Sequence, residues 1–115
     1  MRSPAPVGAL LPAMHVIEIF LPLTRNDGSD QPRELFTRLR RELVDRFGGL
    51  TAFTRAPAEG LWEDEEGGVT ADRIVIFEVV ADIVDKDWWS DMRAQLEREF
   101  EQDEILIRAR AVERL

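Results

Sequence analysis

Six segments of regular hydrophobic pattern follow one another along this chain of 115 residues, in the order strand, helix, strand, strand, helix, strand. Segments rich in β-branched and aromatic residues predict strands at 14–21, 50–56, 73–81 and 104–112. Apolar residues three and four positions apart predict helices at 32–47 and about 88–101. No short stretch elsewhere in the chain has a comparable pattern, so this order of elements constrains the fold more than any single motif.

The β-α-β-β-α-β order matches the split βαβ arrangement. Right-handed crossovers then place the strands in the order 4-1-3-2, with both helices on one face of the sheet. The sequence therefore predicts an α+β fold, a ferredoxin-like sandwich with a four-stranded antiparallel sheet. A rearranged α+β sheet built from the same elements is the alternative.

The ends of the first helix carry clear signals. Pro32 suits a first helical turn, and Gly48-Gly49 supplies a backbone that can turn left-handed after the last turn. Asp85–Asp87 leads into the second helix. The second helix has one apolar stripe, formed by Trp89, Met92, Leu96 and Phe100.

The first thirteen residues differ from the rest of the chain. Residues 1–13 are rich in proline and alanine, and their short apolar part is interrupted by Gly8 and Pro12. This pattern is poor as a signal-peptide core. We interpret 1–13 as a flexible tail or a start-site over-prediction, with Met14 as a possible true start, and 14–115 as a single domain long enough to bury its own core.

The chain is acidic, with a formal net charge of −8, and contains no cysteine and one histidine. The negative charge repels phosphate backbones and anionic lipid surfaces, so we expect neither a nucleic acid nor a membrane as a partner. The missing cysteines exclude disulfides and thiolate metal sites, which suits a cytoplasmic location. A histidine-based metal cluster is excluded too, and no motif indicates a cofactor.

The period-2 alternation of the strands divides their charged residues between two faces. Ile17 and Ile19 lie on the face assigned to the helices, so Glu18 belongs on the open face. By the same argument Glu78 and Arg55 lie on the open face. In the order 4-1-3-2, we expect a row across the open face that consists of Arg108 or Arg110, then Glu18, Glu78 and Arg55.

The open face is otherwise apolar, and such a face is rarely left in water. The residues expected around the charged row are Val16, Phe20, Ile74, Ile76, Val80 and Leu106. The first interpretation is a non-catalytic homo-oligomeric or partner-binding module, most simply a dimer through this face with Glu–Arg pairs tuning the register. The alternative is a small metal-independent enzyme, in which Glu18 or Glu78 acts as general base on a small organic molecule bound in a pocket at this face.

Other chemistry-bearing residues have a simpler structural interpretation. His15 begins a strand on the helix side, so we expect a hydrogen-bonded structural histidine. Trp89 is expected in the core. Glu63–Glu66 lacks the alternating ligands of a calcium loop and indicates a solvated turn. Trp62 would lie beside the open face if the second and third strands form a hairpin, which makes it a candidate for lining a pocket.

Three short motifs resemble those of a known family. They are the run from Arg46 to Thr51 (RFGGLT), then Gly60-Leu61-Trp62, then Phe100 with Gln102 and Glu104. Together they resemble a family of small uncharacterised bacterial proteins, some of which are lipoproteins. This chain lacks the lipidation cysteine of those members. The family has no established activity, so the resemblance implies no functional residue.

Overall fold

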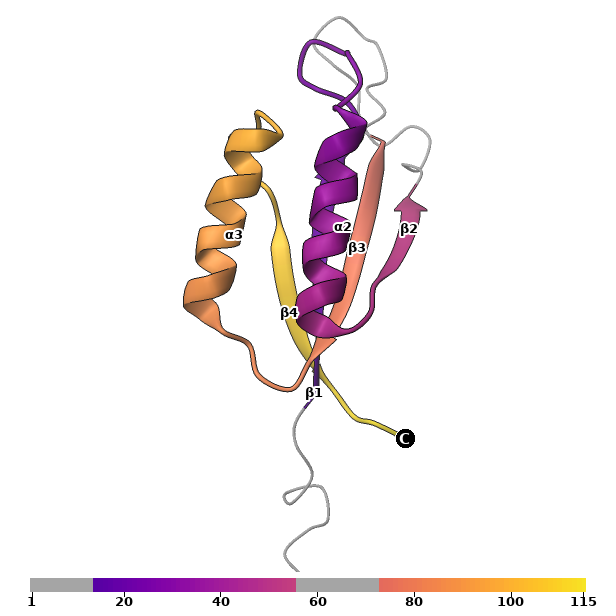
Figure 1. Cartoon of the computed structure of the whole chain (residues 1–115), viewed down its shortest axis with the longest axis vertical. Coiled ribbons are helices and arrows are strands. Elements are labelled where there is room, and N and C mark those ends of the chain that lie inside the picture. The colour runs from indigo at the N-terminus through magenta and orange to yellow at the C-terminus, as the bar shows by residue number, and fades with distance from the viewer. Residues whose placement is uncertain (1–13, 56–72) are drawn as a thin grey trace, which may run out of the picture.

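The computed structural model describes residues 14–55 and 73–115 (Figure 1). Its elements follow the predicted order, and the sheet order is β2-β3-β1-β4, which is the predicted 4-1-3-2 read from the other edge. All strand pairs are antiparallel. The α+β, ferredoxin-like prediction is therefore confirmed. The elements are β1 (Met14–Pro22), α2 (Arg33–Phe47), β2 (Thr51–Arg55), β3 (Ile74–Ala81), α3 (Lys86–Glu99) and β4 (Ile107–Val112).

Local signals place the helix ends. Helix α2 begins directly after Pro32 and ends at Gly48, whose φ of +81° is in the left-handed region that glycine adopts without strain. Helix α3 begins at Lys86, two residues before the predicted start. The reason is a side-chain cap: the Asp85 carboxylate accepts a hydrogen bond from the Trp88 amide at 3.1 Å.

The core lies between the sheet and the two helices, which cover the same face (Figure 1). On the helix side of β1, Ile17, Ile19 and Leu21 are almost fully buried. They pack with the apolar stripes of both helices: Leu35, Leu39, Leu43, Trp89, Met92, Leu96 and Phe100. The predicted core position of Trp89 and the predicted helix-facing sides of β1 and β3 are thus confirmed.

The register between β2 and β3 differs from the expected row. Thr51, not Arg55, lies opposite Glu78, and Arg55 lies opposite Ile74 at the other end of β2. The expectation that Arg55 flanks Glu78 is wrong. Alternation determines which face a residue takes, but a shift of two or four residues keeps every residue on its face. The connection between these strands, residues 56–73, is too long to set the register as a two-residue turn does.

Candidate functional site

Four charged side chains form one network in the middle of the open face. Glu18 lies opposite Glu78 on β3 and opposite Arg108 on β4. The Arg108 Nε donates a hydrogen bond to Glu18 Oε1 at 3.1 Å. Arg110 approaches both acids, with Nε 3.8 Å from Glu18 Oε1 and Nη2 3.9 Å from Glu78 Oε1. We call these four residues the charged row.

Burial is unequal within the charged row. The Glu18 side chain is 9% exposed, whereas those of Arg108 and Arg110 are 57% and 59% exposed. Glu78 is intermediate, at 24%. Glu18 therefore lies beneath two guanidinium groups whose outer sides meet solvent. Because like charges directly opposite each other destabilise a sheet, the two arginines offset the repulsion between Glu18 and Glu78.

An aromatic ring holds Arg108 from a second side. Its guanidinium carbon lies 4.8 Å from the centroid of the Phe20 ring, within the range of a cation–π contact. Phe20 stands on the same face of β1 as Glu18, two residues along. The sequence placed Phe20 on this face as an apolar neighbour, but its pairing with Arg108 depends on the register between β1 and β4.

Apolar side chains surround the charged row. Phe53, Val80 and Leu106 are 42%, 44% and 54% exposed, which is high for large hydrophobic residues. Val16 and Ile76 lie between them and are buried. The face thus combines exposed hydrocarbon with two acids and two arginines whose charges cancel.

The predicted site residues are only partly brought together. Glu18, Glu78, Arg108 and Arg110 form the charged row, and Arg55 is displaced from it by the register described above. Trp62 lies outside the described residues, as do Glu63–Glu66 and the predicted tail 1–13. Thr51, which the sequence analysis did not select, takes the place opposite Glu78.

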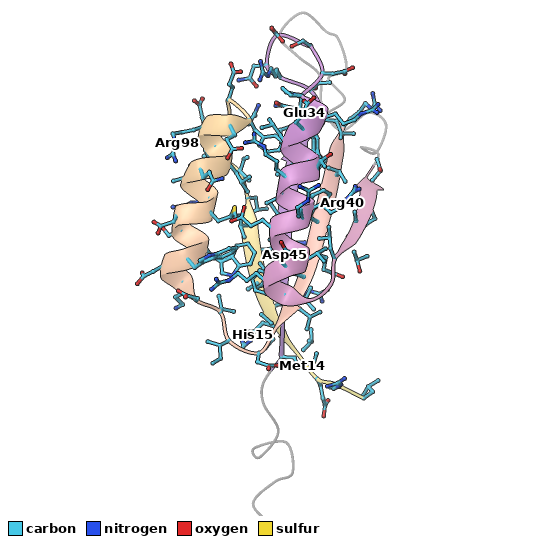
Figure 2. All side chains as sticks on the ribbon, in the orientation of Figure 1. Met14, His15, Glu34, Arg40, Asp45 and Arg98 are labelled. Carbon is cyan, nitrogen blue, oxygen red and sulfur yellow. The ribbon has the colours of Figure 1, made fainter. Side chains whose placement is uncertain are left out.

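The single histidine lies away from the charged row. His15 stands near the end of the sheet where β1 begins (Figure 2), and its Nδ1 is 3.3 Å from the backbone oxygen of Asp82. This contact is the structural hydrogen bond expected from the sequence. It connects the start of β1 to the turn that follows β3.

A hollow of about 520 Å³ lies at one end of the open face. Phe20, Ile74 and Leu106 line its apolar side, and Arg25 and Arg73 are among its polar residues. Its lining includes neither Glu18 nor Glu78, because Phe20 stands between Glu18 and the hollow. The two glutamates thus face the open surface and not this hollow.

Within residues 14–55 and 73–115, no three histidine, cysteine, aspartate or glutamate side chains gather as they would around a metal ion. No helix in the same ranges is long and apolar enough to cross a bilayer.

Comparison with known proteins supports the fold and goes no further. A scan of known families and a search of curated proteins find no match. Among solved structures, a chain described as a phage SAM lyase in complex with S-methyl-5′-thioadenosine superposes with a TM-score of 0.52 and 14% sequence identity. The match covers 87% of this chain and 81% of that one. At this identity the similarity concerns the fold alone.

Proposed function

We propose that this protein is a non-catalytic self-associating module, and that two copies meet through the open faces of their sheets. The observation that carries the proposal is the composition of that face: exposed Phe53, Val80 and Leu106 around a charged row whose net charge is zero. Large apolar side chains that are exposed together on one face of a sheet favour association.

Charge favours a second copy of the chain as the occupant. Two chains that each carry a net charge of −8 repel one another, so they associate most easily where the charge is locally balanced. The two arginines of the charged row are more than half exposed, so they can approach acids of the second copy as well as their own. A two-fold axis through the face places the same residues of both copies in reciprocal positions.

The area of the open face determines how tightly we expect the two copies to bind. Four strands spaced about 4.8 Å apart, with about 3.3 Å per residue, cover roughly 20 by 25 Å. Two such faces bury about 1,000 Å², which is at the small end of specific interfaces. We therefore expect a dimer with a dissociation constant in the micromolar range.

Sedimentation equilibrium tests the proposal directly. The apparent mass should rise from 13.2 kDa toward twice that value as the concentration is raised through the micromolar range. Val80→Asp places a charge in the apolar part of the face and should keep the protein monomeric. Ile83→Asp is the matched control, because Ile83 is 80% exposed in the turn after β3 and outside the face. A monomer mass at every concentration would contradict the proposal.

One observation favours a second candidate, a small enzyme that uses Glu78 as general base. Within the described residues, the ionic contact of Glu78 is a single long one with Arg110, and its carboxylate keeps some access to solvent. The fold neighbour suggests a first substrate: SAM, with S-methyl-5′-thioadenosine sought as product by chromatography. Glu78→Gln should retain the fold and abolish turnover. Equal turnover by wild type and this variant would exclude Glu78 as the base.

A further inference from the structure

The outer edge of β4 is an unpaired strand edge, and its free backbone groups can be identified. The Phe20 amide donates to the Leu106 carbonyl at 3.0 Å, and this pair continues the β1–β4 register by one position beyond Ile19 and Ile107. Along each strand of an antiparallel pair, residues whose backbone amide and carbonyl bond to the partner strand alternate with residues whose amide and carbonyl point away from it. Arg108 and Arg110 therefore bond to β1, while the amides and carbonyls of Ile107, Ala109 and Ala111 face away from the sheet.

One end of this edge is already closed by a side chain. The amide of Ile105, two residues before Ile107, donates to Glu97 Oε2 of α3 at 3.0 Å. This bond agrees with the direction inferred above, in which the backbone amides of the odd-numbered residues point away from β1. Glu97 protects the edge at Ile105, and beyond it the edge from Ile107 to Ala111 remains open, because no other strand of the described sheet lies beside β4.

A groove of about 240 Å³ runs between α3 and this open edge. Trp89, Ile107 and Ala109 contribute its apolar lining, and Lys86 and Arg93 are exposed cations of α3 beside it. No acidic side chain of residues 14–55 and 73–115 lines the groove, although the chain as a whole is strongly acidic. Among the described residues, neither Lys86 nor Arg93 forms an ion pair.

From these observations we infer that β4 accepts an extended acidic peptide as a fifth strand, in the groove beneath α3. Main-chain hydrogen bonds to Ile107, Ala109 and Ala111 supply the attachment, as in other cases of strand addition. Charge selects the occupant on both faces of the added strand. Its side chains on the helix side meet Lys86 and Arg93, and those on the open side lie next to Arg108 and Arg110.

A second copy of the chain fits this edge poorly. Antiparallel pairing of β4 with β4 of another copy would bring Arg108 and Arg110 of both copies onto the same face, side by side. Like charges on adjacent strands are unfavourable. An acidic partner has the opposite effect, so the charges of the edge favour an acidic peptide over self-pairing.

Fluorescence anisotropy with a labelled eight-residue peptide of two Glu-Glu-Val-Val repeats tests the inference, because this peptide presents glutamates on both faces of an extended strand. The peptide should bind, and the same peptide N-methylated at alternate residues should bind at least about tenfold more weakly, because it cannot complete the main-chain hydrogen bonds. Equal binding of the two peptides would show simple attraction of anions and overturn the inference. Failure of the unmodified peptide to bind at millimolar concentration would overturn it as well.

Substitutions in the protein test the same contacts between β4, the groove and the peptide. Ala109→Pro removes an amide that faces away from β1, so the strand should still form while peptide binding is lost. The double variant Lys86→Glu, Arg93→Glu should weaken binding by about tenfold or more. The double variant Arg33→Glu, Arg41→Glu, at exposed positions of α2, changes the net charge by the same amount; it is the charge-matched control and should have little effect. Unchanged binding by the Lys86→Glu, Arg93→Glu variant would refute the role of the groove.

Amide chemical shifts give a readout that does not depend on any variant folding. On addition of the peptide, the amides of Ile107, Ala109 and Ala111 should shift and become protected from exchange. Those of Arg108 and Arg110 should remain protected throughout, since they already bond to β1. Shifts confined to α3 would contradict strand addition. The self-association proposed above does not use the outward amides of β4, so Ala109→Pro should leave it intact.

Discussion

Replacing Arg108 by alanine tests whether the buried Glu18 carboxylate depends on the guanidinium groups above it. At the observed 3.1 Å, the attraction between the unit charges is about 1.3 kcal/mol in a water-like dielectric and about 5 kcal/mol at an effective dielectric constant of 20. Exposed pairs contribute roughly 0–1 kcal/mol, and breaking a buried one costs about 3–5 kcal/mol. Because Glu18 is buried while Arg108 is more than half exposed, we expect Arg108→Ala to cost about 1–2 kcal/mol.

The second arginine limits this loss. After Arg108→Ala, Arg110 still lies 3.8 Å from Glu18, and after Arg110→Ala, the hydrogen bond from Arg108 remains. Removing both leaves Glu18 and Glu78 opposite each other without a cation of the charged row. The double variant should therefore lose more stability than the sum of the two single variants.

Urea denaturation followed by tryptophan fluorescence measures these differences, at a concentration at which the wild type is monomeric. Arg108→Ala also removes the cation–π contact with Phe20, worth about 0.5–1 kcal/mol. Repeating the substitutions in a Glu18→Gln background separates the two effects, since the contact with Phe20 is lost there too but the charge attraction is already absent. Arg98→Ala, which projects outward from α3 (Figure 2), is the control.

The Glu18→Gln background also shows whether the two arginines act through Glu18. In the Glu18→Gln background, Arg110→Ala should cost only its long contact with Glu78, roughly 0–1 kcal/mol, and Arg108→Ala should cost no more than the aromatic contact. If the arginine substitutions cost the same in both backgrounds, Glu18 and the arginines are not coupled. If neither single variant differs from the control by more than about 0.5 kcal/mol, the charged row is solvated and makes no contribution to stability.

Three further predictions concern local devices of the fold. The buried Gln31 side chain donates a hydrogen bond to the Phe100 carbonyl at 2.8 Å and so joins the loop before α2 to the end of α3. Gln31→Ala should lower the free energy of unfolding in urea by about 1–3 kcal/mol. A neutral result would mean that water replaces the amide. Gly48→Ala should lower the free energy of unfolding by about 1 kcal/mol, because alanine adopts this left-handed backbone less readily than glycine. A methyl group at this position meets nothing within 4 Å, so a larger loss would indicate an unexpected clash. The Ser29 hydroxyl and amide donate hydrogen bonds to the Asp27 carboxylate and lower the pKa of Asp27 below 3.8. The folding stability that these bonds contribute should therefore be present above that pH and lost as the pH falls through the native pKa. Ser29→Ala should raise the Asp27 pKa measured by NMR titration, and an unchanged value would refute the assignment.

The amino-acid sequence by itself determined the elements and the faces of this protein. Alternation at period 2 separated Ile17 and Ile19 from Glu18, because a strand points successive side chains to opposite sides. The helix-to-strand corner at Gly48 was equally readable, since a left-handed residue after a helix favours glycine. Such features depend on neighbours in the chain, and a sequence contains them directly. The side-chain cap at Asp85 is also local, and an aspartate three residues before Trp88 was a signal that could have placed the start of α3 correctly.

Register and long-range contacts were decided by the tertiary structure. Whether Thr51 or Arg55 faces Glu78 depends on how far β2 slides along β3, and both choices satisfy the same alternation. The bond from Ile105 to Glu97 depends on where α3 packs against the sheet. Such contacts join segments that are brought together by the burial of a shared core. The energy of that burial depends on the whole arrangement, so no local pattern of residues encodes which side chains finally meet.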